Sequence, residues 1–465
     1  MNELLLLMKS ELVITVIIFG LLFIKVGKGM SNDRLLPIIQ LSLLANLIIG
    51  FFFNTEGNLF GDMFYTSPLI AFEKNILNLG VYLIALLNTD WLKKTANLAE
   101  FFLLMLSALL GMFCLISSGN LLIFYLALEL ATIPIAALAN FDLDKKSSSE
   151  GAMKMILSSA FSSGILLFGI SLIYGVTGTI SFNELPLLAD GSTLYTLAFI
   201  FLFSAFAFKL SIVPFHFWTA DVYEGSPIAV TSFLSVISKG AIAFILLTVL
   251  YKVFLPLQQV WYLLLMILAA ATMLVGNLFA MRQQNMKRFL AFSSIAQVGF
   301  ILVGVSNGTE MGISSVIYFV LIYLFSNLAA FGVIAVISEN THKENINDYK
   351  GLYQTNPFLS WILALALFSL AGVPPTAGFF GKLFLLTAGG AKANFGFMIF
   401  ATLNMIVSLY YYLRVTRAIF MDKNEKPIAT IKTSAPVKLA MIICAAGIVL
   451  VGLMGWIFDY IQTLH

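Results

Sequence analysis

The chain has 465 residues, of which 60% are hydrophobic and only 11% are charged. Soluble domains carry about 25% charged residues, so this composition excludes an ordinary soluble protein and predicts an all-α polytopic membrane protein. Neither a Walker loop nor a dinucleotide-binding glycine pattern is present, which argues against ATP-driven transport and against NADH binding by this chain. Cys114 and Cys444 lie in apolar runs and indicate neither a disulfide framework nor a metal site.

Apolar runs of about 20 residues, each long enough to cross a bilayer, predict about fourteen transmembrane helices. The runs lie near residues 4–24, 35–53, 68–88, 98–117, 120–140, 151–175, 194–217, 227–250, 258–281, 289–305, 312–337, 358–390, 395–413 and 437–458. The first run is longer and more charged than the core of a cleavable signal peptide, so we expect no cleavable signal.

The basic residues between these runs fall almost entirely on one side of the predicted bundle. Seventeen belong to that side and three to the other. The seventeen are Lys25, Lys28, Arg34, Lys93, Lys94, Lys145, Lys146, Arg282, Lys287, Arg288, Lys343, Lys350, Arg414, Arg417, Lys423, Lys426 and Lys432, and the three are Lys9, Lys252 and Lys392. By the positive-inside rule the richer side is cytoplasmic. Both termini are therefore predicted to face the periplasmic side of a bacterial inner membrane.

Glu129 and Lys209 are charged residues inside apolar runs. Glu129 follows Asn120 by nine residues, about 13 Å along a helix, which places it near the middle of the bilayer. A charge there costs about 2.5–3.5 kcal/mol on insertion scales, so it is normally paired, hydrated and functional. Pro214 frees the carbonyl of Leu210 and predicts a broken helix beside Lys209. A kinked helix whose lysine reaches the interface is the alternative.

The segment after this break carries further polar residues. Lys239 lies inside the next apolar run. His216 could relay protons, because the unperturbed pKa of histidine is about 6.5, or it could be a structural or entry residue. Asp221 and Glu224 have the spacing of a capping box in front of a new helix, with proton collection as the second interpretation.

A second interruption lies in LAGVPPTAGFFGK, residues 370–382. Pro374 and Pro375 lack an N–H group and leave the carbonyls of the residues four positions earlier, Leu370 and Ala371, without helical donors. Lys382 follows this break. Interrupted helices at matching places in two halves point to an inverted-repeat transporter.

Two sequence offsets support such a repeat. Lys382 follows Lys209 by 173 residues, and Gln297, a polar residue inside another run, follows Glu129 by 168. The predicted domains are therefore 1–97 (three N-terminal helices), 98–250 (first five-helix repeat), 251–413 (second repeat) and 414–465 (cytoplasmic loop and last helix).

We expect the Lys154 side chain either to reach the membrane interface or to act inside the helix bundle. An ion pair of Lys74 with the adjacent Glu73 is expected.

A row of such residues suits proton transfer. Burial opposes a charged lysine and a nearby carboxylate favours it, so movement of the partner makes a lysine bind or release a proton. Moving one proton against 100 mV requires about 2.3 kcal/mol. Nothing in the sequence supplies that energy, so it must come from a partner or from an ion gradient.

Several stretches closely resemble the antiporter-like subunit N family of the proton-pumping NADH–quinone oxidoreductase, respiratory complex I. They are GNLLIFYLALEL, PFHFWTADVYEGSPIAVTSFLSVISK, NMKRFLAFSSIAQVG and GVPPTAGFFGK, and the similarity extends from about Phe101 to Tyr412. The resemblance implies fourteen helices, two inverted repeats, each with a broken helix, and proton translocation in the membrane arm. Lysine rather than glutamate at position 382 resembles subunits N and L more than subunit M. No long lateral C-terminal helix follows Tyr460, which argues against subunit L.

The resemblance also implies roles for single residues and for partners. Glu129 and Lys209 would form the pair of the first half-channel, Lys239 the bridge and Lys382 the outlet. It implies no cofactor on this chain, with NAD, FMN, iron–sulfur clusters and quinone in partner subunits. It implies contacts with membrane subunits of the M and K types, with lipid, and with protons and water, but not with nucleic acid.

One residue departs from the family pattern. Gln297 stands where such subunits usually carry histidine, and glutamine can only order water or pass hydrogen bonds. Two other protein classes remain open, namely a subunit of a Mrp-type cation/proton antiporter and a purely structural membrane scaffold.

Overall fold

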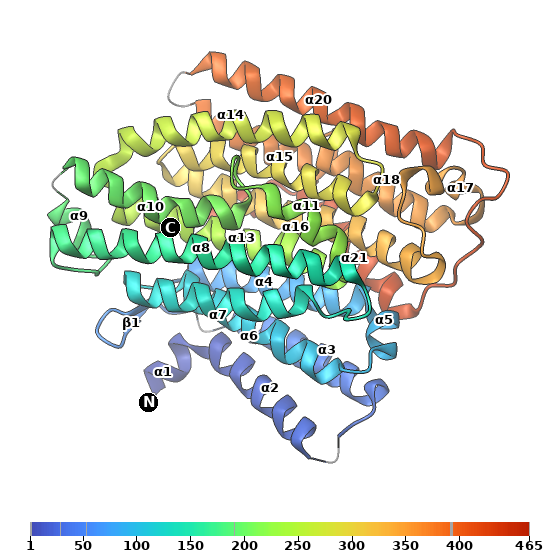
Figure 1. The fold of residues 1–465 in the computed structure, drawn as a ribbon, viewed down its shortest axis with the longest axis horizontal. Coiled ribbons are helices and arrows are strands. Elements are labelled where there is room, and N and C mark those ends of the chain that lie inside the picture. Colours follow the sequence, from blue (N-terminus) through green and yellow to red (C-terminus); the bar gives the residue numbers. More distant parts are fainter. Residues whose placement is uncertain (1, 28, 53, 190, 391–393, 465) are drawn as a thin grey trace.

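The computed structural model describes residues 2–27, 29–52, 54–189, 191–390 and 394–464. In these ranges the chain is a bundle in which most of the long helices run along a common direction (Figure 1). The helices are α1 (Asn2–Leu7), α2 (Lys9–Val26), α3 (Asn32–Gly50), α4 (Pro68–Leu87), α5 (Thr89–Lys94), α6 (Leu98–Ile116), α7 (Leu121–Ala139), α8 (Lys146–Thr177), α9 (Leu185–Leu188), α10 (Thr193–Leu210), α11 (Phe217–Gly225), α12 (Ile228–Ser232), the π-helix η1 (Phe233–Ser238), α13 (Lys239–Thr248), the π-helix η2 (Val249–Val253), the 3₁₀ helix η3 (Leu255–Leu257), α14 (Gln258–Arg282), α15 (Met286–Ser306), α16 (Glu310–Thr341), the 3₁₀ helix η4 (Ile346–Tyr349), α17 (Leu352–Thr355), α18 (Pro357–Ala371), α19 (Ala377–Gly390), α20 (Phe395–Phe420), α21 (Ala435–Leu453) and α22 (Trp456–Gln462).

The predicted set of spans agrees with these helices. Within the described ranges, twelve helical segments are long and apolar enough to cross a membrane. α2 has a comparable length of 18 residues but carries three charges, and the shorter α18 and α19 together occupy the interrupted run predicted at 358–390. With α2 and this broken pair, the twelve segments account for the fourteen predicted runs, and the all-α class is confirmed.

Both predicted helix breaks are present. α10 ends at Ser211, whose φ is 63°, and α18 ends at Gly372, whose φ is 84°. The Val213–Pro214 and Pro374–Pro375 peptide bonds that follow are cis. The chain then continues as α11 and α19. Two features were not predicted, namely the antiparallel hairpin of β1 (Gly57–Leu59) and β2 (Phe64–Thr66) and the π-helical turns η1 and η2.

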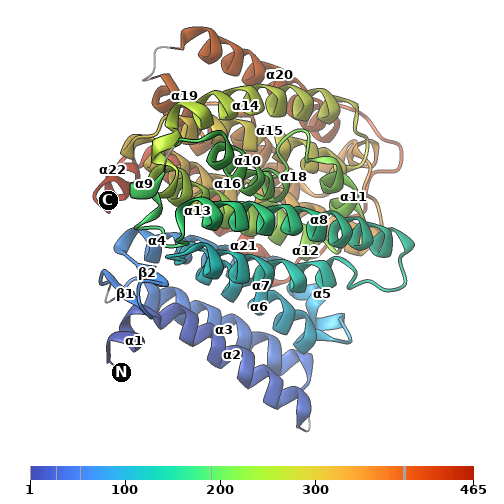
Figure 2. The ribbon, with the colours of Figure 1, turned by 60° about the vertical axis from the view of Figure 1, so that its left-hand side comes forward.

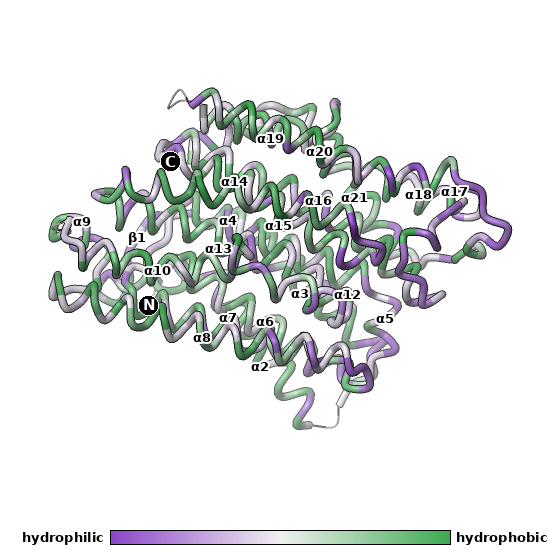
Figure 3. Tube along the Cα trace, turned by 45° about the horizontal axis from the view of Figure 1, so that its top comes forward, coloured by the Kyte–Doolittle hydropathy of each residue, from purple (hydrophilic) through white to green (hydrophobic). Residues whose placement is uncertain are grey.

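The two ends of the bundle differ in polarity. The end that holds α5 and α17 is rich in hydrophilic segments (Figure 3). There, loops and helix ends are joined by ion pairs, such as Lys94 with Glu339 at 2.7 Å. Both termini lie at the opposite end, near α9 and β1 (Figures 1 and 2). Lys28 and Lys392, which were counted among the basic residues of the two predicted sides, lie outside the described residues.

The expected pairing of Lys74 with Glu73 is wrong. Lys74, on α4, forms its ion pair with Glu11 on α2 at 2.6 Å, and both side chains are 3% exposed. Successive residues of a helix point about 100° apart, so Glu73 faces a different neighbour.

Lys154 reaches the polar edge of the bundle, as one of its two interpretations expects. There it forms ion pairs with Glu150 and Asp221, each at 2.6 Å.

The most deeply buried helices are α15 and α16, in each of which an apolar stretch of 18 residues is buried throughout. Glycines allow some helices to approach closely. A Cβ atom on Gly111 of α6 would lie 2.4 Å from the backbone nitrogen of Ala131 on α7, whereas one on Gly164 of α8 would meet nothing within 4 Å. The first glycine is therefore required by helix packing and the second is not.

We expect Gly111→Ala to destabilise the protein by about 1–3 kcal/mol, because the added methyl group overpacks the α6–α7 contact. The matched variant Gly164→Ala should be neutral or stabilising by up to about 1 kcal/mol, since alanine favours an exposed helix. Thermal unfolding in detergent, followed by circular dichroism, tests both variants. Equal midpoints for the two would contradict the packing argument.

Candidate functional site

Lys209 lies on the last turn of α10, just before the first helix break, and is buried. Its Nζ donates hydrogen bonds to Thr132 Oγ1 of α7 at 2.6 Å and to Ser159 Oγ of α8 at 2.9 Å. It also lies 5.6 Å from the centroid of the Phe208 ring. The lysine thus joins three helices through neutral hydroxyl groups.

Glu129 is not in direct contact with Lys209. Its carboxylate accepts a hydrogen bond from Ser163, which lies one turn from Ser159 along α8. Glu129 and Thr132 lie one turn apart on α7. Each charge is therefore bound by hydroxyl groups, and these lie on neighbouring turns of α7 and α8.

Lys239 follows the π-helical turn η1, which widens the helix just before this residue. Its Nζ donates to Ser294 Oγ of α15 at 2.8 Å and lies 5.7 Å from the Tyr223 ring centroid. One turn earlier, Ser235 shares a hydrogen bond of 3.1 Å with Tyr323. π-Helical turns such as η1 occur often at functional sites.

A small cavity of about 20 Å³ lies beside Lys209 and is also lined by Thr132 and Ser238, the residue before Lys239. A volume of this size holds about one water molecule when polar partners surround it. Most of its other lining residues are apolar, and Lys239 itself does not line it.

Gln297 and Lys382 meet at the second helix break. Nζ of Lys382 donates to the carbonyl of Leu370 at 2.7 Å and to that of Ala371 at 3.3 Å. These are the two acceptors that the prolines were predicted to free. Nε2 of Gln297 donates to the same Leu370 carbonyl at 2.9 Å and to the Tyr412 hydroxyl at 3.1 Å. Tyr412 in turn shares a hydrogen bond with Ser293, the neighbour of Ser294.

The three buried lysines share one property. Within the described part of the chain, none of Lys209, Lys239 and Lys382 forms an ion pair, and each binds only hydroxyl or carbonyl oxygens. A hydroxyl can donate or accept, and a carbonyl accepts from either form of the amine. Each site therefore serves a protonated and a neutral lysine.

His216 is not joined to this row by any hydrogen bond among the described residues. It is buried in front of α11, and its ring centroid lies 4.4 Å from that of Phe217. The geometry fits the structural or entry interpretation better than a direct relay.

The capping-box interpretation of Asp221 and Glu224 is wrong. Both residues lie inside α11, and α12 begins after Pro227 without a side-chain cap. Asp221 instead binds Lys154 at 2.6 Å and Arg288 at 2.8 Å, and Glu224 binds Arg288 at 2.7 Å. Burial alone would raise the pKa of Asp221, but these two hydrogen-bonded cations outweigh it and lower that pKa.

The residues missed from the sequence are the hydroxyl partners. They are Thr132, Ser159, Ser163, Ser293, Ser294, Tyr323 and Tyr412. A signal was present, because SSAFSS in the α8 segment places hydroxyls four residues apart inside an apolar run. Within the described ranges, no group of three or more His, Cys, Asp and Glu residues could hold a metal ion.

Comparisons with known proteins agree with this geometry. Residues 118–408 match the family model of the NADH:quinone oxidoreductase/Mrp antiporter transmembrane proteins. NADH-quinone oxidoreductase subunit N of Phocaeicola vulgatus is 46% identical, with 91% of this chain and 90% of that protein covered. The subunit N of Azobacteroides pseudotrichonymphae is 45% identical, with 89% and 87% covered.

Solved structures give the same fold. A chain of respiratory complex I from Thermus thermophilus with bound aureothin superposes with a TM-score of 0.82 at 27% identity, over 97% of this chain and 98% of that one. A chain of the Mrp complex from a Dietzia species has a TM-score of 0.85 at 20% identity, over 97% and 95%, which indicates the fold alone.

The broken helices and the buried lysines define an antiporter-like membrane protein. The chain belongs to the NADH:quinone oxidoreductase/Mrp antiporter family, and the predicted resemblance to its subunit N branch is confirmed.

We expect Asp221→Asn to lower the thermal midpoint of the purified protein at about pH 7, because Lys154 and Arg288 lose a shared anion. The pKa of Asp221 is lowered in the folded state, so its stabilisation is present above the unfolded pKa of about 3.9 and is lost only below it. The midpoint difference should therefore persist at about pH 5.

Asp142→Asn is the matched control, because Asp142 has one exposed partner, Lys145, three residues along the chain. Exposed pairs of this type contribute about 0–1 kcal/mol. An Asp221 variant that loses no more stability than this control would contradict the network interpretation.

Proposed function

We propose that this chain is a proton-translocating membrane-arm subunit of NADH–quinone oxidoreductase, with electron transfer and quinone reduction on other subunits. One observation carries the proposal. Buried ionisable side chains follow one another through the middle of the bundle, and each is held by groups that can accept either protonation state. The subunit N relatives at up to 46% identity support the complex in which this occurs.

The first half of the proposed route joins Glu129 to Lys209. In this proposal protons pass from Ser163, which binds the carboxylate, to Ser159 and Thr132, which bind the amine. When the carboxylate is charged it stabilises a protonated lysine, and when it is neutralised the lysine releases its proton. From Lys209 the proposed route continues to Lys239; the small cavity beside Lys209 reaches Ser238, the residue before Lys239 in the chain.

The second half runs from Lys239 to Lys382. Ser294, Ser293, Tyr412 and Gln297 supply hydrogen-bonding groups along α15 and α20. Gln297 cannot carry a charge, so we propose that it orders this segment through its bond to the Leu370 carbonyl rather than by taking up a proton.

The proposal also covers the two repeats, the neighbouring subunits and the orientation of the chain in the membrane. We propose that residues 98–250 and 251–413 are the two inverted repeats, and that membrane subunits of the M and K types are the neighbours. The basic end of the bundle is proposed to be cytoplasmic and both termini periplasmic, because of the distribution of Lys and Arg. NAD, FMN, iron–sulfur clusters and quinone belong to the partner subunits in this proposal.

Glu129→Gln and Lys209→Met are expected to reduce coupled proton movement about tenfold or more, because each removes a group that transfers the proton. The measurement is proton uptake or release per NADH oxidised by the whole complex in proteoliposomes. Lys146→Met is the control, since Lys146 is exposed at the start of α8. Unchanged pumping by fully assembled Glu129 and Lys209 variants would support a structural scaffold instead.

A Mrp-type cation/proton antiporter is the second candidate, since that fold is shared. Vesicles that carry the complex separate the two candidates. Proton release on addition of Na⁺, without quinone reductase activity in the preparation, would favour the antiporter.

Ser159→Ala should slow coupled proton movement while leaving assembly intact, because a hydrogen bond to a charged group contributes about 1.5–3 kcal/mol. Ser158→Ala is the matched control on the preceding residue of α8. Ser158 is partly exposed and bonds only to backbone carbonyls of its own helix. Pumping that declines equally in both variants would show that the hydroxyl of Ser159 has no specific role.

A further inference from the structure

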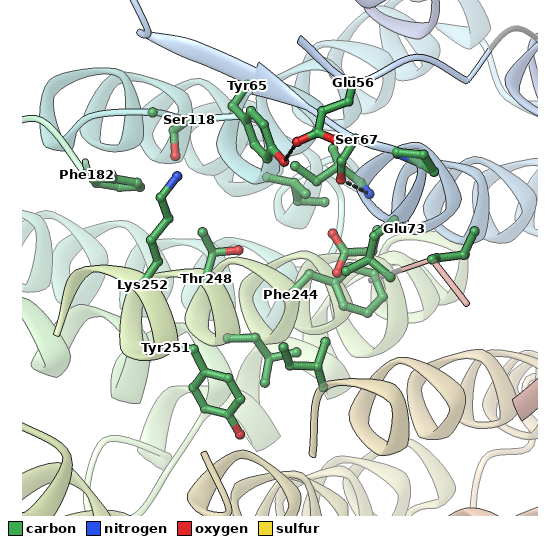
Figure 4. Close-up of a pocket in the computed structure, with 18 of the residues that line it drawn as sticks. Glu56, Tyr65, Ser67, Glu73, Ser118, Phe182, Phe244, Thr248, Tyr251 and Lys252 are labelled. Carbon is green, nitrogen blue, oxygen red and sulfur yellow. Dashed lines mark hydrogen bonds between the residues drawn. The ribbon is translucent and has the colours of Figure 1, made fainter. Parts of the chain in front are cut away.

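A cavity of about 490 Å³ lies at the end of the bundle that holds both termini (Figure 4). The hairpin β1–β2, the start of α4, the ends of α6 and α13 and the start of α16 line it. Glu56, Lys252 and Glu310 are exposed at its edge, and Tyr65 donates a hydrogen bond to Glu56 at 2.8 Å. The cavity is therefore open to the aqueous side that the termini face.

Glu73 lies deep in this cavity. It is 4% exposed and follows the N-cap Ser67 of α4 by six residues, about 9 Å along the helix. Its carboxylate points into the cavity (Figure 4). It forms neither a hydrogen bond nor an ion pair with any residue of the described ranges, so its charge has no direct partner.

The neighbouring lysine has a direct carboxylate partner of its own. Lys74 is bound to Glu11 at 2.6 Å and lies 5.0 Å from the centroid of the Phe64 ring. The positive charge of Lys74 is therefore already matched by one carboxylate. Buried charges are normally paired, and an unpaired one is neutralised by a proton when water can deliver it.

Other titratable groups lie near the cavity and the ion pair. They are Lys9 and Glu11 on α2, Glu56 and Tyr65 near and in the hairpin, Lys74 on α4, Cys114 on α6, Tyr251 and Lys252 on η2, and Glu310 on α16. None of them lies within ion-pair distance of Glu73. Lys74 and Lys252 carry positive charge close to this space, which disfavours a bound metal cation and leaves the proton as the ligand.

We propose that Glu73 is a proton-binding site open to the side of the membrane that holds the termini, separate from the row that runs from Glu129 to Lys382. The carboxylate takes a proton from a hydronium ion in the cavity, which gives a carboxylic acid and a water molecule, and release is the reverse. This site stands on the cavity and on its unpaired carboxylate, so it goes beyond the proposed function.

Infrared difference spectroscopy tests the site directly. The whole complex in proteoliposomes, with this end of the bundle facing outward, receives a step in external pH. The carbonyl stretch of a newly protonated carboxyl group is expected in the unaltered complex and is expected to disappear in Glu73→Gln. Glu310→Gln, at the edge of the same cavity, should retain the band, and a full band in Glu73→Gln would overturn the proposal.

A second variant covers failure of Glu73→Gln to assemble. Glu73→Asp keeps the carboxyl group but shortens its side chain, so the band should persist at a shifted frequency. An unshifted band would mean that another residue binds the proton.

Access to the cavity has its own test. Thr248→Cys places a thiol on the wall opposite the hairpin, and a membrane-impermeant methanethiosulfonate added from the outer side should modify it. Lack of modification from that side would overturn the proposal. Glu129→Gln should leave the thiol modification unchanged, so failure of this proposal is distinguishable from failure of the proposed function.

Discussion

The structure depends on one requirement, which is that every charged side chain inside the bilayer needs a polar partner within the bundle. Lys209, Lys239 and Lys382 meet this requirement with hydroxyl and carbonyl oxygens rather than with carboxylates. A direct ion pair would hold a lysine in its charged form. Neutral partners leave its protonation state free to follow more distant charges, which is the property that proton transfer needs.

The two helix breaks meet the requirement in different ways. At the second break, Lys382 donates to the two carbonyl groups that the prolines release. The amide of Gln297 also donates to one of them, the Leu370 carbonyl. At the first break, Lys209 turns instead to hydroxyls of α7 and α8. Both breaks therefore interrupt a helix next to a buried lysine, but the first lysine binds hydroxyl groups and the second binds backbone carbonyl groups.

The sequence predicted the features that depend on local patterns. Apolar runs predicted the spans, and Pro374 and Pro375 predicted the free acceptors at the second break. Partners distant in the chain were not predictable in this way. Lys74 binds Glu11 rather than the adjacent Glu73, and Asp221 binds Lys154 and Arg288 rather than a helix end, because packing between helices decides both contacts. The hairpin and the π-helical turns also depend on such packing.

The regular helix α13 has a consequence for electrical insulation. It begins with Lys239, which faces Ser294, and ends with Thr248, which lines the cavity at the end of the bundle that holds the termini. Nine residues of an α-helix make two and a half turns over about 13 Å, so these two side chains point to opposite sides. Between them lie buried aliphatic and aromatic residues from Ile242 to Leu247. α13 therefore places a layer of apolar side chains between Lys239 and this cavity, with Phe244 and Leu247 on the cavity side, and such a layer resists the passage of charge.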